Sequence, residues 1–336
     1  MNELKHWQVI LKSNELQNEP LRVTLNSKDI VLFRSNDKIA GYFDECPHRR
    51  MKLSKGKITN GRLVCPYHSW SYGTDGSCIK PSGGEGNFSD NLFECKEYLG
   101  LIWIKLSISN VDFPVLEMEG YNLISTTSSL ISAPLELVLD NFTEVEHTSS
   151  VHALLGYDIK TLSNVEVKLE TSETSVRLFN KGKQKELPVF LENFLGIEKD
   201  DLFIDDWTTY FSPVYTVYDQ YWIDPKTNRE RNNKLKIFVF FTPIDNFSTK
   251  IFVITYLKYN IFDNLGLNVF LAPALSLFTD LEILLDSNII KSLASHEVSL
   301  KGCKLTKFDK ALTQNRIKIN KIYKNIISDE LQQSTS

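Results

Sequence analysis

Cysteine is scarce in this sequence, and its few copies show no pattern of disulfide pairing. Five cysteines occur among 336 residues, an odd number in a chain that is long enough to bury a substantial core without covalent cross-links. Such usage is typical of a reducing compartment, so we expect a cytoplasmic protein. Cys78, Cys95 and Cys303 have no partner at a suitable spacing, and we expect them to be small buried side chains.

Long hydrophobic runs are also absent. The longest apolar stretch, residues 265–278, contains Asn268 and Pro273 and is shorter than the roughly 20 residues that span a bilayer. It predicts a buried helix or helix pair. At the N-terminus, Lys5 and Lys12 interrupt the apolar segment that a secretory signal requires. These absences argue against a membrane-spanning or secreted protein.

The chain has no excess of positive charge. It carries 38 Lys and Arg residues against 42 Asp and Glu residues, which gives a net charge of −4 and an isoelectric point near 5.9. Proteins that bind nucleic acids or acidic membrane surfaces are usually basic over much of their surface. We therefore expect neither nucleic acid nor a membrane as a partner.

The sequence pattern divides the chain into two parts. Residues 1–107 form short apolar stretches separated by turns, such as 30–33 and 39–43 around a polar turn. The expected linker is 107–119. Beyond it, helical patterns alternate with long strands; the helices are expected at 135–155, 264–293 and 310–327, and the strands at 207–222, 235–241 and 250–256. We predict an all-β domain over residues 1–110 and an α+β domain over residues 111–336.

Four residues of the N-terminal part form two mixed pairs, each with one thiol and one imidazole. One residue separates Cys46 from His48, and two separate Cys65 from His68. A bridged di-iron cluster takes such a set, with both cysteines on one iron and both histidines on the other. Tetrahedral zinc accepts the same ligands, but zinc fingers usually place both cysteines in one pair and both histidines in the other. The mixed pairing favours the iron–sulfur cluster over zinc.

The segments around these pairs closely resemble the Rieske domain of the Rieske non-haem iron oxygenases. The resemblance covers residues 46–56 and 61–76, and residues 98–103 match the strand that closes that domain. Arg50 and Ser69 stand where the family usually has glycine, and neither is a ligand position. The resemblance implies that a [2Fe–2S] cluster is held by Cys46, His48, Cys65 and His68.

Two histidines of the C-terminal part, His147 and His152, are candidate ligands of a second metal. On a regular helix, five positions place two side chains about 140° apart. A shared metal therefore requires the predicted helix to be broken between them. The segment resembles the oxygenase pattern of an asparagine, then an acid three residues before the first of two ligand histidines. The resemblance implies that His147 and His152 bind a mononuclear iron and that Asn141 lies close to it.

Glu144 occupies the position at which this family usually has aspartate. The resemblance implies that it hydrogen-bonds between the iron site and the Rieske histidine of a neighbouring subunit, in a head-to-tail trimer. From the residues alone, Asp140, Glu144 and Glu146 also fit an acidic helix face in water, and for Glu146 this simpler interpretation is preferred.

A site with two histidines and one carboxylate needs a third ligand. The family carries it far downstream, on a helix in which an acid is followed by two residues and then isoleucine or valine. Asp280 fits that pattern because Ile283 follows it, although the acid or amide that usually comes next is missing. We therefore expect Asp280 as the ligand, with Glu282 and Asp286 as alternatives.

The resemblance extends over almost the whole chain and implies an oxygenase. Its fold would be an N-terminal all-β Rieske domain followed by a helix-grip α+β catalytic domain with an antiparallel sheet. Its cofactors would be one [2Fe–2S] cluster and one mononuclear Fe(II), with O2 as co-substrate. A ferredoxin or flavin reductase would donate the electrons, and NAD(P)H would act only through that reductase. The homotrimer would bring each cluster close to the iron of a neighbouring subunit.

Three classes of function compete. Chains of this length resemble monooxygenases and demethylases more than the longer ring-dihydroxylating subunits. We therefore expect hydroxylation or oxidative demethylation of a small organic substrate, with cis-dihydroxylation as the alternative. A Rieske electron-transfer protein would not need the second site, and a protein with a decayed iron site is the remaining possibility. The aromatic stretch 207–222 is expected to be core more than pocket.

Charge is unevenly distributed along the chain. Six basic and no acidic residues occur between Arg49 and Arg62, among the candidate cluster ligands. An acidic electron donor would be attracted to such a stretch. The segment 301–324 is also basic, and for it a solvated face is the preferred interpretation.

Overall fold

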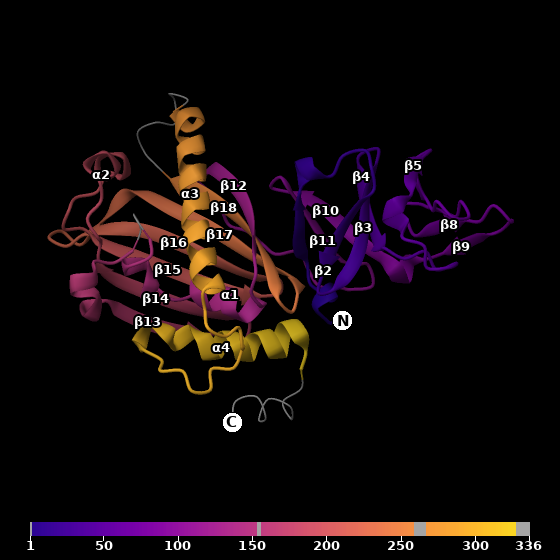
Figure 1. Ribbon diagram of the computed structural model, residues 1–336. Helices are drawn as coiled ribbons and strands as arrows, with labels where there is room; N and C mark the ends of the chain where they lie inside the picture. Colours follow the sequence, from indigo (N-terminus) through magenta and orange to yellow (C-terminus); the bar gives the residue numbers. More distant parts are fainter. Residues whose placement is uncertain (1, 153–155, 259–266, 327–336) are drawn as a thin grey trace. The chain divides into compact units, whose positions relative to one another are not determined.

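The chain folds into two compact units. The computed structural model describes residues 2–152, 156–258 and 267–326 (Figure 1). The first unit consists of residues 1–114 together with 242–246, and the second of residues 115–241 and 247–336. Within the described ranges, no helix is both long and apolar enough to span a membrane.

The first unit is built from two antiparallel sheets. The larger has six strands in the order β1-β11-β10-β4-β3-β2. Its strands are β1 (Gln8–Lys12), β2 (Leu21–Leu25), β3 (Lys28–Ser35), β4 (Lys38–Phe43), β10 (Leu92–Tyr98) and β11 (Leu101–Leu106). The smaller has five strands in sequence order, β5 (Lys57–Thr59), β6 (Arg62–Val64), β7 (Ser71–Tyr72), β8 (Ser77–Ile79) and β9 (Glu85–Asn87). The predicted hairpin around residues 35–38 is the β3–β4 hairpin.

Apolar strands form the interior of this unit. Every residue of β11 is buried, as a continuous apolar run predicts for a strand covered on both faces. Ile30 to Phe33 of β3 are also fully buried. A second cluster of buried side chains, which includes Tyr42, Leu63 and Tyr72, packs around the two candidate cluster cysteines. The loops of the smaller sheet therefore rest on a rigid base.

The second unit is one seven-stranded sheet with helices. The strand order is β12-β18-β17-β16-β15-β14-β13, and every pairing whose register is described is antiparallel. The strands are β12 (Asn122–Ile131), β13 (Glu166–Thr171), β14 (Ser175–Lys183), β15 (Leu202–Phe211), β16 (Val214–Asp224), β17 (Arg229–Asp245) and β18 (Ser248–Lys258). The predicted fold class, an all-β part followed by an α+β part with an antiparallel sheet, is confirmed.

Helices cover the inner face of this sheet. The α-helices are α1 (Leu135–Phe142), α2 (Val189–Leu195), α3 (Leu267–Lys291) and α4 (Lys310–Lys318), and α4 continues as a π-turn over Ile319–Lys324. Figure 1 shows α3 running across the sheet. Val138 of α1, Ile283 and Ile290 of α3 and Ala311 of α4 share one core with inward residues of the strands. Helices α1, α3 and α4 thus each bury apolar side chains against the sheet.

Three sequence-based expectations were wrong in detail. The stretch 207–222 is two strands, β15 and β16, joined at Ser212 and Pro213; proline lacks the N–H that a strand ladder needs, so it marked the turn. The helix expected at 135–155 ends at Phe142. Cys78 is buried as expected, but Cys95 is half-buried and Cys303 is exposed.

Candidate metal centres

Two loops of the first unit carry the four candidate cluster ligands in the same conformation. In one, the N–H of Arg50 donates to Cys46 O at 2.8 Å and the N–H of Cys46 to Met51 O at 2.8 Å. In the other, the N–H of Ser69 donates to Cys65 O at 3.1 Å and the N–H of Cys65 to Trp70 O at 2.8 Å. The repeated pattern presents one cysteine and one histidine from each loop.

The positions that differ from the family explain why glycine is usual there. Arg50 and Ser69 both have a φ of 57°, the left-handed region that glycine adopts without steric cost. Each closes its loop four residues after the cysteine. The loops therefore keep their shape with non-glycine residues, at a cost in conformational energy.

The side chains of the two loops separate into a thiol pair and an imidazole pair. Cys46 and Cys65 are buried, and burial, together with the neighbouring Cys46 thiol, raises the pKa of Cys65. The rings of His48 and His68 lie 4.5 Å apart between centroids and nearer the surface. Two adjacent buried thiols need positive charge beside them to ionise together. This donor set fits a [2Fe–2S] cluster with cysteines on the inner iron and histidines on the outer one.

Aromatic side chains support both pairs. The Trp70 ring stacks on His48, with 4.7 Å between centroids and 4° between planes. The hydroxyl of Tyr72 lies 3.1 Å from Cys46 Sγ. A thiolate has no proton to give, so with the cluster bound the phenol would be the donor, and such hydrogen bonds to sulfur help to set the potential.

In the second unit, the chain leaves the helical conformation between the two candidate histidines. Helix α1 ends at Phe142, whose carbonyl accepts a hydrogen bond from the Tyr218 hydroxyl. His147 begins a short 3-10 turn, and His152 follows it in irregular backbone. The break that a shared metal requires is therefore present, and the two rings meet with centroids 4.9 Å apart.

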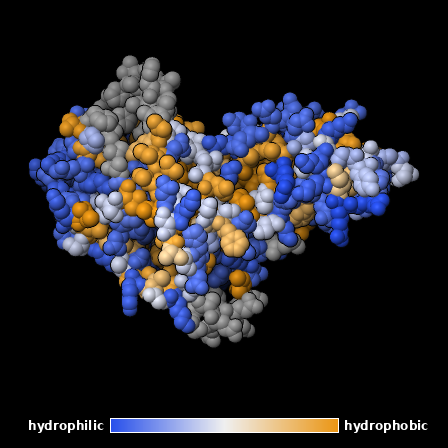
Figure 2. Space-filling view, viewed as in Figure 1, coloured by the Kyte–Doolittle hydropathy of each residue, from blue (hydrophilic) through white to orange (hydrophobic). Residues whose placement is uncertain are grey.

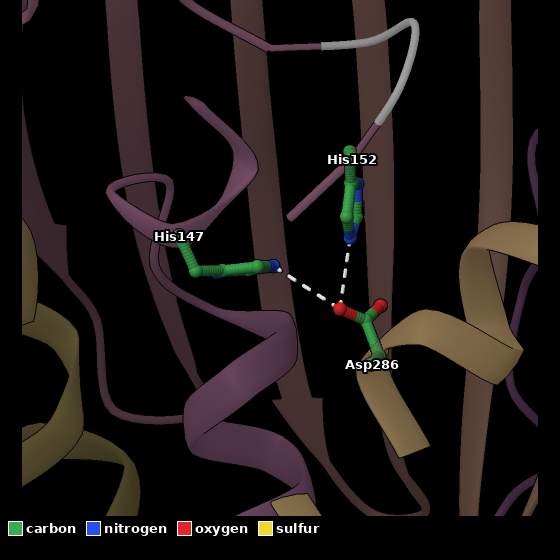
Figure 3. A group of neighbouring side chains, drawn as sticks. All are labelled: His147, His152 and Asp286. Carbon is green, nitrogen blue, oxygen red and sulfur yellow. Dashed lines mark hydrogen bonds and ion pairs between the residues drawn. The ribbon is translucent and has the colours of Figure 1, made fainter. Parts of the chain in front are cut away.

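Both histidines point at one carboxylate, that of Asp286 on α3 (Figure 3). Asp286 Oδ1 lies 3.2 Å from His147 Nε2 and 2.8 Å from His152 Nε2. Among the described residues, these three form the one group of ligand atoms close enough together to share a metal ion, all within 4.8 Å of one another. Two imidazoles and one carboxylate form the ligand set of mononuclear non-haem iron.

The structure does not bring Asp280 into this group. Asp280 is exposed on α3, whereas Asp286 is 4% exposed. The two lie six residues apart, so they project about 120° apart around the helix and about 9 Å apart along it. The carboxylate beside the histidines is thus one of the two alternatives to the expected residue.

Two further carboxylates orient the imidazoles. Glu144 hydrogen-bonds to Nδ1 of His147 and also accepts from the N–H groups of Glu146 at 2.5 Å and His147 at 3.3 Å. Glu282, the other alternative as a ligand, lies 3.1 Å from Nδ1 of His152. A carboxylate on Nδ1 leaves Nε2 free of its proton for a metal. Each candidate ligand histidine therefore has a carboxylate beside its Nδ1, and the one beside His147 is hydrogen-bonded to it.

The charges around the site also fit a cation. Burial lowers the pKa of His147, but hydrogen bonds to Asp286 and Glu144 outweigh burial and raise the pKa to about 9. Burial raises the pKa of Asp286, but hydrogen bonds to the two histidines outweigh it and hold the pKa at about 2. The group attracts positive charge, and a divalent cation would displace the proton from His147.

Two models of known protein families match this chain, one in each part of it. One describes the Rieske [2Fe-2S] domain and matches residues 6–86, and the other describes the vanillate O-demethylase oxygenase C-terminal domain and matches residues 131–272. The two matches occur in the order that the sequence predicts. The chain belongs to the Rieske oxygenases.

Relatives of this Rieske oxygenase include proteins from bacteria and plants. It is 30% identical over 169 residues to methylxanthine N1-demethylase NdmA of Pseudomonas putida, over 44% of this chain and 47% of that protein. It is 29% identical over 208 residues to the chloroplast protein TIC 55 of Pisum sativum, over 57% of this chain and 37% of that protein. The chain thus matches less than half the length of these relatives.

A solved structure shares the fold over nearly the whole chain. The crystal structure of dicamba monooxygenase bound to dicamba superposes with a TM-score of 0.77 at 20% sequence identity, over 96% of this chain and 98% of that chain. The arrangement of a Rieske domain followed by a sheet-and-helix domain is therefore common to both.

The oxygenase domain has a cavity, partly open to solvent, beside the histidine and aspartate group. Its volume is about 140 Å³. The candidate ligands His147, His152 and Asp286 line it, and so does Asn141, as the resemblance implies. Its other walls are largely aromatic and aliphatic, so the inward aromatic residues of β15 and β16 serve both as core and as pocket lining.

One residue that the sequence did not indicate anchors the loop between the histidines. Lys185 follows β14, and its ammonium donates to the carbonyls of Thr148 at 2.6 Å and His152 at 2.7 Å. Gly156 packs against the same loop: its φ is 124°, and a Cβ there would lie 2.4 Å from Thr148 Oγ1. An isolated lysine in a polar segment gives no sequence signal of such a role.

Proposed function

We propose that this chain catalyses hydroxylation or oxidative demethylation of a small organic substrate, with O2 and externally supplied electrons, at a mononuclear non-haem Fe(II). The observation that supports this most is the convergence of two imidazoles and one carboxylate on the wall of a cavity. An electron-transfer Rieske protein would need neither the cavity nor this group.

We assign the [2Fe–2S] cluster to Cys46, His48, Cys65 and His68, within a domain over residues 1–110. We assign the iron to His147, His152 and Asp286, within a catalytic domain over residues 111–336, and Asp286 replaces Asp280 as the third ligand. The iron, when bound, supplies open coordination positions for O2 next to the substrate.

The remaining residues of the site prepare it for this chemistry. Glu144 hydrogen-bonds to Nδ1 of His147 and so fixes the tautomer that leaves its Nε2 available, and the Glu282 carboxylate lies within ion-pair distance of Nδ1 of His152. Asp286 contributes the negative charge that balances the metal. The aromatic walls exclude water from the substrate, and Asn141, whose buried Nδ2 has no hydrogen-bond partner among the described residues, is available to donate to a group bound in the cavity.

Electrons would come from a ferredoxin or flavin reductase, with NAD(P)H as their indirect source. We propose a homotrimer in which Glu144 couples the iron site of one subunit to the Rieske cluster of the next. Figure 2 shows apolar side chains gathered over α3, where Leu277, Leu281 and Leu284 are 72%, 47% and 54% exposed. A row of exposed leucines is typical of a surface that another subunit covers.

We also propose a cytoplasmic location, because no disulfide joins any of the five cysteines and cysteines without disulfides are typical of a reducing compartment. The chloroplast relative shows that other compartments occur among similar proteins.

Oxygen uptake tests the proposed reaction. Protein loaded with cluster and iron, reduced by a ferredoxin and its reductase, is screened against small aromatic compounds that carry N-methyl or O-methyl groups. We expect substrate-dependent uptake of O2, with formaldehyde released from methylated substrates and one labelled oxygen atom retained from isotopically labelled O2 in hydroxylated ones. Incorporation of both atoms would instead indicate cis-dihydroxylation. Loss of cluster electrons with no product from any compound would contradict the proposal.

Glu144→Gln tests the coupling between subunits. Gln keeps the size of the side chain but loses the charge-assisted hydrogen bond to His147, which is about twice as strong as a neutral one. We expect both metals to remain and single-turnover oxidation of a pre-reduced cluster to slow by about tenfold or more. Oxidation at the wild-type rate would contradict the coupling role.

A further inference from the structure

Three polar side chains form a row across the inner face of the sheet. Asn180 on β14, Asp205 on β15 and Gln220 on β16 are direct partners in the strand register. They are 0%, 6% and 7% exposed. Inward positions on either side along the same strands hold Phe203, Trp207, Tyr218 and Trp222, so the row interrupts an otherwise aromatic face.

Hydrogen bonds within the row leave two buried amide oxygens without a partner among the described residues. Asn180 Nδ2 donates to the carbonyl of Asp205 at 3.0 Å, and Gln220 Nε2 donates to Asp205 Oδ1 at 3.0 Å. Asn180 Oδ1 and Gln220 Oε1 are buried without a hydrogen-bond partner among the described residues. A buried acceptor without a partner costs free energy, so the row is incomplete until something donates to it.

Two members of the row face the substrate cavity. Asp205 and Gln220 line it together with the candidate iron ligands, and so do Phe203, Trp207 and Tyr218. A cavity of comparable volume binds a small aromatic molecule. The cavity therefore combines flat aromatic walls with a fixed pair of oxygen acceptors.

We propose that Asp205 and Gln220 determine specificity by accepting a hydrogen bond from an N–H or O–H group of a planar, uncharged or cationic ring substrate. This inference rests on the proposed function and adds the substrate class to it. An anionic substrate such as a carboxylate would meet two further oxygen acceptors there and would be rejected. Burial raises the pKa of Asp205 to about 7, so above that pH the carboxyl is ionised and both of its oxygens accept hydrogen bonds.

Binding of a matched pair of probes tests the proposal. Indole and benzofuran have the same shape, but only indole carries an N–H donor. By calorimetry on the anaerobic, metal-loaded protein, we expect indole to bind about tenfold or more tightly than benzofuran, the factor typical of a hydrogen bond to a buried polar partner. We expect no binding of benzoate.

Variants connect the preference to the row. In Asp205→Leu, the ratio of the two Kd values should fall to about one, and Gln220→Met should lower it without the change in charge. Asp219→Leu, on the outward face of β16 beside Lys236, should keep the wild-type ratio.

Equal affinities in the wild type, a ratio that survives in both inward variants, or no binding of indole at millimolar concentration would overturn the proposal. Binding requires no turnover, so a loss of O2 uptake alone would contradict the proposed function and leave this inference standing.

Discussion

At the scale of single residues, the cluster loops show how a family pattern tolerates exceptions. Arg50 and Ser69 adopt the left-handed conformation with φ at 57°, which costs a non-glycine residue roughly 1 kcal/mol. Both side chains are exposed, so neither of them needs space in the packed interior of the domain. The loops keep their fold because backbone hydrogen bonds to the candidate ligand cysteines hold them.

Replacing Ser69 by glycine should relieve the backbone strain of its positive φ. Ser69→Gly should raise the free energy of unfolding of the cluster-loaded protein by about 0.5–1 kcal/mol, because glycine adopts the native φ without a steric penalty. Chemical denaturation followed by the cluster absorbance gives the value. Ser82→Gly is the control, since Ser82 is exposed and is not among the residues with positive φ; an equal gain there would contradict the explanation.

The buried carboxyl of Asp205 should make stability depend on pH. Burial raises its pKa from the ordinary 3.8 to about 7. Between these values the folded state holds a proton that the unfolded state has released, so the free energy of unfolding falls as pH rises. From pH 5 to pH 8 the loss should be about 2–3 kcal/mol.

Asp205→Asn removes the titrating group and should remove that part of the slope. Denaturant titrations at both pH values, on protein treated with a chelator to release mononuclear iron, give the difference between variant and wild type. Parallel pH profiles of the two proteins would show that Asp205 ionises in the folded state as it does in water.

At the scale of elements, the sequence predicted which segments carry the site but not how they meet. The two loops of the first unit are local, so their ligand spacing was readable. The α3 helix was also predicted, but Asp280 and Asp286 lie on opposite flanks of the buried Ile283, about 120° apart. Which flank faces the histidines depends on how the helix packs on the sheet, and no local pattern encodes that.

Packing also decides whether the cations of the basic C-terminal helix face solvent or pair with other residues. Its cations were expected to form a solvated face, but several connect it to the rest of the second unit. Arg316 makes two hydrogen bonds to Asp140, at 2.8 and 2.6 Å, and Lys324 pairs with Glu136. Lys310 donates to the carbonyl of Val167 on the edge strand β13 at 3.2 Å. These contacts join α4 to α1 and to the sheet edge.

The loop between the histidines depends on one such contact. Lys185→Met removes the donor to Thr148 O and His152 O, so the loop should lose its fixed geometry and the affinity for mononuclear iron should fall about tenfold, as for other outer-sphere changes. Iron titration measures the affinity, and the cluster spectrum should not change. Lys183→Met, which removes a surface pair with Asp200, is the control. Unchanged iron affinity in Lys185→Met would contradict the anchoring role.

At the scale of the whole molecule, charge is concentrated around the cluster loops. Arg49, Arg50, Lys52, Lys55 and Lys57 are exposed. Arg62, the sixth basic residue of this stretch, instead bonds internally to Ser71 and Ser77. Two acids from outside the counted stretch lie beside it, Glu45 near Arg50 and Asp29 near Lys52. The exposed patch is thus smaller than the sequence suggests, but it remains basic in a chain of net charge −4.

An acidic electron donor should use this patch. We expect the rate of cluster reduction by a ferredoxin to fall steeply as salt rises, because exposed charges are screened over about 8 Å at physiological ionic strength. Lys52→Glu with Lys55→Glu should slow reduction about tenfold at low salt in stopped-flow measurements. Lys304→Glu with Lys321→Glu changes the charge equally at exposed positions of the other unit and should have little effect. Equal slowing by both pairs would exclude a specific docking surface.

We propose that one chain holds both a Rieske cluster and a separate iron bound by His147, His152 and Asp286. The iron content of purified, reconstituted variants tests it most directly, with the Rieske spectrum as an internal reference. Wild type and Asp280→Ala should hold about three irons per chain, two in the cluster and one at the mononuclear site. Asp286→Ala should hold about two, with the Rieske spectrum intact. Three irons in Asp286→Ala, or the loss of one in Asp280→Ala, would contradict the account.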